Sequence, residues 1–143
     1  MRHVAVFDTN VLLSGVGWKG KPWQCLELAR AGVIEGLICR EIADELAEKL
    51  QQKLGLSADD VNEILTDLLA FLRLVPIAGS LKVVAADPED DKVLECAVAG
   101  IATHIITGDR RHLLPLGTFQ GIRIVTPAEF IESETRAPGE LAP

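Results

Sequence analysis

The stretch VAVFDTNVLLSG, residues 4–15, places a carboxylate directly after a short apolar run. Residues 4–7 are rich in β-branched and aromatic types, which predicts a strand that is buried on both faces. Asp8 then follows the carboxyl end of this strand, the edge at which open parallel sheets bind ligands. Taken alone, Asp8, Thr9 and Asn10 are also typical of residues that turn the chain and cap the next helix. The role of Asp8 therefore depends on where the other acids fall.

The composition is that of one globular domain with a core of aliphatic side chains. The chain has 143 residues, of which 48% are hydrophobic and only 4% aromatic. No apolar run approaches the roughly 18 residues of a membrane span, and no signal-peptide pattern follows Met1. We therefore expect a cytoplasmic protein with no membrane partner. Cys25, Cys39 and Cys96 lie far apart in apolar sequence, which favours reduced, buried thiols.

The charge balance excludes one mode of nucleic-acid binding. Acidic residues outnumber basic ones by 21 to 14, which gives a net charge of −7. The protein therefore cannot hold a polyanion by overall positive charge. A divalent cation among clustered carboxylates would supply the missing positive charge locally.

Strands alternate with helices along the chain. Strands are predicted at 33–39, 103–107 and 122–126, helices at 22–31, 41–53, 57–72, 88–100 and 127–132, and a Gly-rich loop at 14–20. One or both of the apolar segments 74–77 and 81–84 are strands. This order predicts a three-layer α/β/α sandwich with a central, mainly parallel sheet of four to five strands. Residues 1–132 form one domain, and residues 133–143 are expected to be a flexible tail.

Two more acids fall at the same edge of this predicted sheet or near it. Asp109 follows the strand 103–107 after a single glycine, so it belongs to the same edge as Asp8. Asp91 lies in the first turn of the helix 88–100 and heads an apolar stripe at i+3, i+7 and i+10. The helix dipole explains Asp87 and Asp90 as solvated acids of that turn, but it does not explain an acid on the inward line.

A fourth acid, Glu45, adjoins the buried stripe of the helix 41–53. Glu41, Asp44 and Glu48 on the same helix are not separated from Glu45 by the pattern alone. Carboxylates clustered at one edge repel each other unless a cation lies among them, and hard oxygen ligands select Mg²⁺ or Mn²⁺. Zinc would usually draw in His or Cys, and the histidines at 3, 104 and 112 do not have ligand spacing.

These motifs together resemble the PIN-domain ribonucleases, and specifically the VapC-like toxin components of toxin–antitoxin pairs. The resemblance covers nearly all of residues 2–132. It rests on the strand ending in Asp8 with TNVL and Ser14 behind it, on EIADEL with Glu45, on DPEDDKVLECAVAG with Asp91, and on IITGD with Thr107 and Asp109. No single motif is specific, but their order and spacing are.

The resemblance implies a Mg²⁺- or Mn²⁺-dependent phosphodiester hydrolase that cuts RNA to leave a 3′-hydroxyl and a 5′-phosphate. Asp8, Glu45, Asp91 and Asp109 would be the catalytic metal ligands. The residues that orient them would be Thr9, Asn10, Ser14 and Thr107, with Asp87 or Asp90 as auxiliary acids. Lys19, Lys21, Arg110 and Arg111 are predicted at the same edge of the sheet, where they would either hold RNA phosphates or be solvated loop charges. An antitoxin protein and a second copy of the chain are the implied protein partners.

Three other readings of the sequence compete with this one. Haloacid-dehalogenase-like phosphatases also place an Asp after the first strand, but they need a second Asp two residues later, where this chain has Asn10. A non-catalytic PIN-like interaction module is disfavoured because all four acids are present. A housekeeping RNA-processing nuclease would use the same site as a toxin, so the sequence does not separate these two roles.

Overall fold

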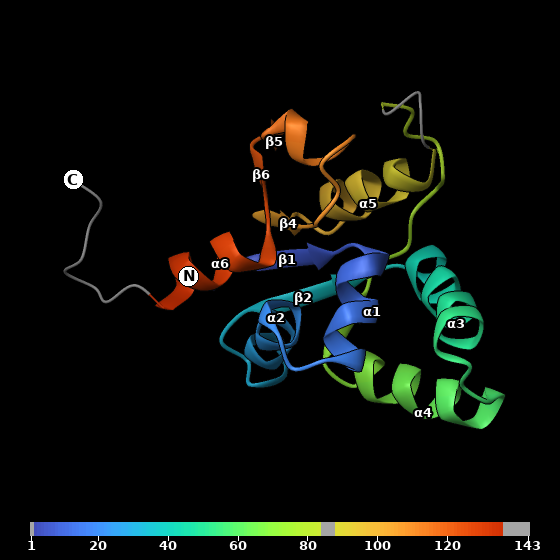
Figure 1. Ribbon diagram of the computed structural model, residues 1–143. Helices are drawn as coiled ribbons and strands as arrows, with labels where there is room; N and C mark the ends of the chain where they lie inside the picture. The colour runs from blue at the N-terminus through green and yellow to red at the C-terminus, as the bar shows by residue number, and fades with distance from the viewer. Residues whose placement is uncertain (1, 84–87, 136–143) are drawn as a thin grey trace.

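Six strands form a single sheet in the order β3-β2-β1-β4-β6-β5 (Figure 1). The computed structural model describes residues 2–83 and 88–135. The strands are β1 (Val4–Phe7), β2 (Glu35–Ile38), β3 (Leu72–Leu74), β4 (His104–Ile106), β5 (Thr118–Phe119) and β6 (Ile122–Val125). All neighbours pair in parallel except β5 and β6. The carboxyl ends of β1, β2 and β4 therefore meet at one edge of the sheet.

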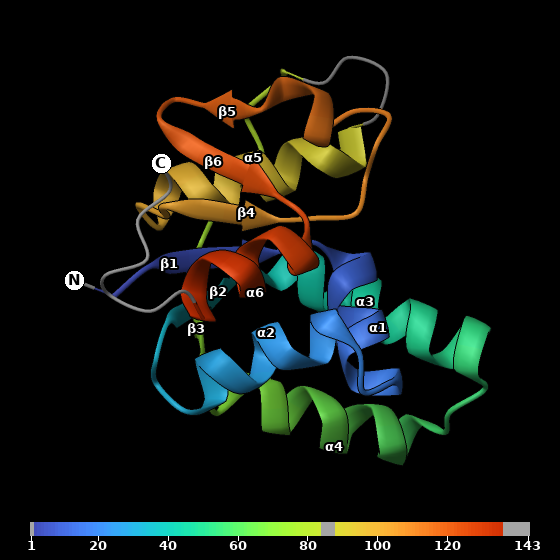
Figure 2. The same ribbon diagram turned by 60° about the vertical axis from the view of Figure 1, so that its left-hand side comes forward.

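Helices cover both faces of this sheet. They are α1 (Thr9–Gly17), α2 (Lys21–Arg30), α3 (Arg40–Leu54), α4 (Ala58–Leu69), α5 (Pro88–Ala99) and α6 (Pro127–Thr135), and a short 3₁₀ turn spans Leu114–Leu116. Helix α5 packs on β1, β2 and β4 from one side, whereas α1, α2 and α6 pack together on the other (Figure 2). The predicted α/β/α sandwich with a mainly parallel sheet is confirmed.

The structure corrects the predicted loop at 14–20, because α1 continues to Gly17. Helix α2 packs closely on this part of α1. A Cβ atom at Gly15 would lie 2.5 Å from the Leu26 side chain, so the glycine permits this approach. Gly15 therefore serves helix packing rather than a turn, and glycine content alone does not distinguish these two uses.

The other differences from the predicted elements concern where helices and strands begin and end. Helix α4 ends at Leu69, and the third strand lies at Leu72–Leu74 instead of 74–77. Residues 81–83 form no strand, and residue 84 lies outside the described residues. The two-residue β5 was not predicted. Gly36 lies within the continuous strand β2, where a Cβ would lie 2.4 Å from the Leu72 side chain, so the glycine permits this close packing.

Further expectations concern the cysteines and the chain end. Cys25, Cys39 and Cys96 are free and buried, as predicted. Helix α6 extends three residues past the predicted domain end at 132, and the remainder of the predicted tail, 136–143, lies outside the described residues. Within the described ranges, no helix is both long and apolar enough to cross a membrane.

A buried histidine joins β4 to α6 at the amino-terminal edge of the sheet. The His104 ring lies edge-on to Phe130 of α6, with ring centres 5.2 Å apart, and 4.6 Å from the ring of His3. His104 is 4% exposed. Burial, together with the nearby charges of His3 and Arg123, lowers the pKa of His104 to about 4.

This lowered pKa predicts that stability falls as the solution is acidified. An unfolded His104 binds its proton near its ordinary pKa of 6.5, so between that value and the folded pKa acid favours the unfolded chain. We expect the His104→Phe variant to lose about 2 kcal/mol less unfolding free energy than wild type between pH 7 and pH 4.5. Urea denaturation at both pH values measures this difference. An equal loss in both proteins would contradict the burial of a neutral His104.

Candidate active site

The first two acids are brought together by the pairing of β1 with β4. These strands are parallel neighbours, with Val6 opposite Ile105. Asp8 directly follows β1, and its backbone N–H donates to the carbonyl of Ile106, 3.1 Å away. Asp109 follows β4 after Thr107 and Gly108, so the predicted placement of both acids at one edge is confirmed.

The Asp8 carboxylate is buried, and each of its oxygens accepts a hydrogen bond. It is the N-cap of α1, accepting the backbone N–H of Val11 at 2.8 Å, and its second oxygen accepts the hydroxyl of Thr107. Burial raises the pKa of Asp8, and the negative charge of Asp109 adds to this, while the two hydrogen bonds oppose it. An ionised Asp8 is therefore costly in the protein alone and would be stabilised by a nearby cation.

Glu45 is the acid of α3 that enters the site. Its Oε1 accepts the hydroxyl of Thr9 and lies 2.8 Å from Nζ of Lys92, and its Oε2 lies 3.7 Å from Nζ of Lys49. Burial opposes ionisation, but the interactions with Lys92, Thr9 and Lys49 lower the pKa of Glu45 overall. Among the acids of α3, Glu45 lines both this site and an adjoining groove, whereas Glu41, Asp44 and Glu48 line the groove only.

Backbone N–H groups hold the Asp109 carboxylate. Its Oδ1 accepts from Arg111 at 3.1 Å and from His112 at 3.4 Å, and its Oδ2 accepts from Leu113 at 3.1 Å. Burial alone would raise the pKa of Asp109, but these backbone hydrogen bonds, together with one from the Asp90 carboxyl, lower it. The loop after β4 is therefore wrapped around an ionised carboxylate.

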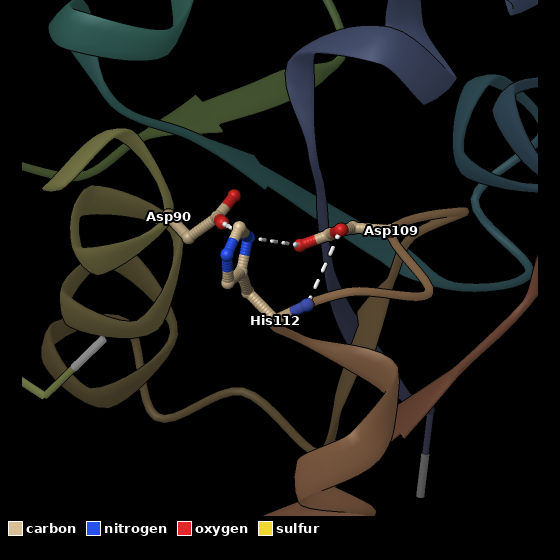
Figure 3. A group of neighbouring side chains, drawn as sticks. All are labelled: Asp90, Asp109 and His112. Atoms are coloured by element: carbon tan, nitrogen blue, oxygen red, sulfur yellow. Dashed lines mark hydrogen bonds and ion pairs between the residues drawn. The ribbon is translucent and has the colours of Figure 1, made fainter. Parts of the chain in front are cut away.

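Asp90 and His112 complete this side of the site (Figure 3). Nδ1 of His112 lies 3.2 Å from Oδ2 of Asp90 and 3.7 Å from Oδ2 of Asp109. One ligand atom from each of the three residues falls within 4.8 Å of the others. The histidines have no ligand spacing in the sequence, but the structure brings His112 beside Asp90 of α5, which is distant in sequence.

Asp91 lies elsewhere, although the sequence favoured it as the third acid. It is 6% exposed, and its Oδ1 accepts the backbone N–H of Val83 at 3.0 Å. Asp91 thus holds the backbone of Val83 against α5. The apolar stripe correctly indicated a buried acid, but the acid that the structure brings beside Asp109 is Asp90.

A cavity of about 280 Å³ opens between these elements. Its lining comes from the starts of α1 and α5 and from α3, namely Asp8, Thr9, Asn10, Glu45, Lys49, Glu89, Asp90 and Val93. Asn10 faces it and accepts a hydrogen bond from Nζ of Lys49 at 2.9 Å. Ser14, further along α1, is not among the lining residues that the structure describes. The predicted auxiliary acid Asp87 lies outside the described residues.

The basic residues expected to contact RNA do not line this cavity in the described part of the chain. These residues are Lys19, Lys21, Arg110 and Arg111. The ammonium group of Lys19 instead lies 5.7 Å from the centre of the Trp23 ring. The cations beside the acids are Lys49 and Lys92, which the sequence analysis did not single out. Lys49 stands four residues after Glu45 on α3, so its helical spacing was an available signal, whereas Lys92 meets Glu45 from another helix.

Comparison with known proteins assigns the fold family. The sequence profile of the PIN domain matches residues 4–111, which includes every element that contributes to the cavity. The chain belongs to the PIN domain family. Curated proteins give no match to the sequence.

Two solved structures share the PIN fold of this chain. VapBC2 from Rickettsia felis, solved with a DNA fragment from its promoter, has a TM-score of 0.59 at 14% identity, over 85% of this chain and 96% of the other. PAE2754 from Pyrobaculum aerophilum has a TM-score of 0.59 at 13% identity, over 94% of this chain and 91% of the other. Both likenesses concern the fold alone.

The side chains of this PIN domain fit a hard divalent cation. Asp8, Glu45, Asp90 and Asp109 supply oxygen donors, which suit Mg²⁺ and Mn²⁺. Asp90 and Asp109 each offer a carboxylate oxygen within 4.8 Å of the other. A cation in this position would offset their repulsion, since two carboxylates so close together repel each other when both are ionised.

We expect Asp90, and not Asp91, to be required for metal binding. Calorimetric titration with Mn²⁺ should show affinity reduced by about tenfold or more in Asp90→Asn, or about 1.4 kcal/mol. The matched Asp91→Asn variant should stay within about twofold of wild type, because an amide oxygen can still accept the Val83 N–H. A larger loss in Asp91→Asn than in Asp90→Asn would contradict this placement.

Proposed function

We propose that this PIN-domain protein is a Mg²⁺- or Mn²⁺-dependent endoribonuclease that hydrolyses RNA phosphodiester bonds. The observation that supports this most strongly is the convergence of Asp8, Glu45, Asp90 and Asp109 from four separate segments on one edge of the sheet. Such crowding of carboxylates is unfavourable in a protein that does not bind a cation. Asp90 replaces Asp91 in the proposed ligand set.

The chain holds three of these carboxylates in place before any ligand arrives. Val11 and Thr107 fix Asp8, Thr9 fixes Glu45, and three backbone N–H groups fix Asp109. Thr107 also accepts the Asp109 N–H at 3.0 Å, so one hydroxyl orients two acids. Preorganised ligands need little rearrangement during the reaction, which favours catalysis.

Hydrolysis at this site would place the scissile phosphate against the four carboxylates. A bound Mg²⁺ or Mn²⁺ would polarise that phosphate and lower the pKa of an attacking water. The carboxylates would hold the cation, while Thr9, Asn10 and Thr107 keep them oriented. In-line attack would then leave a 3′-hydroxyl and a 5′-phosphate.

The activity is tested with an end-labelled RNA of mixed sequence. We expect cleavage with Mg²⁺ or Mn²⁺, none with chelator, and a kcat/KM lower by about 100-fold or more in Asp90→Asn, equivalent to about 2.7 kcal/mol of transition-state stabilisation. Asp91→Asn is the matched control. If wild type leaves the RNA intact and calorimetry detects no metal binding, a non-catalytic interaction module replaces this proposal.

We further propose that the nuclease is the toxin of a toxin–antitoxin pair and that it forms a homodimer. The structural neighbour VapBC2 is a complex bound to a fragment of its promoter. By analogy, the partner of this chain would be a small DNA-binding protein encoded by an adjacent gene.

The toxin role predicts that induced expression arrests growth of the host cell. Arrest should be lost in Asp90→Asn, because the toxicity would come from RNA cleavage, and relieved when the protein of the adjacent gene is co-expressed. Growth curves with RNA integrity measured in parallel provide the readout. Active cleavage of RNA in vitro without growth arrest would favour the housekeeping RNA-processing role.

A further inference from the structure

We propose that Lys49, which lines the active-site cavity, and Lys92, which lines the adjoining groove, bind the substrate phosphate and hold the backbone of single-stranded RNA beside the carboxylates. This assignment rests on the proposed nuclease function. It differs from the sequence expectation, which assigned RNA contacts to the loops around Lys19 and Arg110.

Lys92 reaches from α5 to Glu45 of α3 and lines the groove that adjoins the cavity. Its side chain is 14% exposed, and Nζ lies 2.8 Å from Oε1 of Glu45 and 2.6 Å from Oε2 of Glu89. Lys92 follows Asp90 by two residues on α5. A lysine is rarely this well buried unless its ammonium group has a defined partner.

Lys49 approaches the same carboxylate from the other side. Its Nζ lies 3.7 Å from Oε2 of Glu45 and 2.9 Å from Oδ1 of Asn10, and its side chain is 23% exposed. One ammonium group therefore lies at each oxygen of Glu45. The two lysines come from different helices, so the arrangement is not a consequence of helical spacing alone.

The charge of the cavity gives these lysines a role in substrate binding. Asp8, Asp90 and Glu45 line the same cavity as Lys49, and these acids alone would repel a phosphodiester. In the free protein the ammonium groups neutralise Glu45. When a divalent cation joins the carboxylates, Glu45 no longer needs both lysines, and their N–H donors become available to phosphate oxygens at the same place.

Two arginines of the described chain have partners outside the site. Arg30 makes hydrogen bonds of 2.8 and 2.7 Å to the carboxylate of Asp67 and lies against the ring of Phe71. Arg73 is held by Glu35 at 2.7 Å and by the carbonyl of Gly100. These pairs join helices and strands to one another, whereas Lys49 and Lys92 both converge on Glu45.

A purely structural role for the two lysines makes the opposite prediction for metal binding. If they only held Glu45 in place, removing one would loosen a metal ligand and weaken metal affinity. If they serve phosphate, removing a positive charge beside the carboxylates leaves metal affinity unchanged or raises it. RNA affinity would fall, because a phosphate contact is lost.

The test compares Lys49→Gln and Lys92→Gln with Lys53→Gln, a matched loss of one charge four residues beyond Lys49 on α3. Lys53 is exposed and lines the same groove as Lys92, so this control tests the charge of the groove apart from the contacts with Glu45. Fluorescence anisotropy with a labelled single-stranded oligoribonucleotide in Ca²⁺ measures RNA affinity at several salt concentrations. Calorimetry measures Mn²⁺ affinity without RNA. Circular dichroism shows whether each variant is folded.

We expect each cavity variant to bind RNA about fivefold to tenfold more weakly, with a salt dependence reduced by about 0.7 in log–log slope for each lost phosphate contact. Mn²⁺ affinity should be equal to that of wild type or higher. Lys53→Gln should change RNA affinity by less than about twofold. Lys92→Arg, which keeps the charge, should retain RNA binding better than Lys92→Gln. If Lys92→Gln does not fold, Lys49→Gln decides the question, because its side chain is more exposed.

Two results would overturn the assignment while leaving the nuclease proposal intact. One is wild-type RNA affinity in both cavity variants together with weaker Mn²⁺ binding, which would make the lysines structural supports of Glu45. The other is an equal loss in Lys53→Gln, which would indicate diffuse charge instead of a phosphate site. A wild-type protein that neither binds nor cleaves RNA contradicts the nuclease proposal itself.

Discussion

The architecture of the site depends on one buried carboxylate, that of Asp8. Asp8 directly follows β1, and its carboxylate caps α1 by accepting the Val11 N–H and also accepts the hydroxyl of Thr107, which follows β4. One side chain thus fixes the start of the first helix and links the two central strands at their carboxyl ends. Because burial and the charge of Asp109 raise the pKa of Asp8, this link carries an electrostatic cost. A side chain that is costly when ionised and yet central to the fold is typical of a functional position.

The repulsion between the crowded carboxylates is offset in two different ways, by lysines near α3 and by backbone N–H groups after β4. On the α3 side, ammonium groups from Lys49 and Lys92 neutralise Glu45. On the β4 side, Asp109 is held by backbone N–H groups and by its contacts with Asp90 and His112. A charged lysine side chain can move and exchange its partner for a ligand, whereas backbone N–H groups are fixed by the fold. The backbone hydrogen bonds of Asp109 therefore persist when a ligand binds, and the lysine partners of Glu45 are the contacts that can change.

Sequence patterns predicted the sandwich because its signals are local: apolar strands, capping residues and acids placed just after strands. The position of Asp8, Glu45 and Asp109 at one edge followed from the alternation of strands and helices. The choice between Asp90 and Asp91 did not follow, since adjacent residues in a first helical turn differ in direction by about 100°, and the apolar stripe marks the buried direction only. His112 and the contact of Lys92 with Glu45 were missed because the partners lie on other elements, so no spacing within one segment indicates them, whereas Lys49 stands four residues after Glu45 on the same helix.

The two adjacent aspartates of α5 show how one helical turn can serve both packing and chemistry. Asp91 is turned toward the preceding segment and accepts the Val83 N–H, and Glu95, one turn further on, accepts the N–H groups of Ala78, Gly79 and Leu81. These two acids hold residues 78–83 against α5 and so help to position the helix. The start of the helix in turn sets where Asp90 and Lys92 meet the residues of α3 and the β4 loop. Acids that are not ligands thereby position those proposed to be, and this explains part of the acidic surplus of a protein whose proposed substrate is itself an anion.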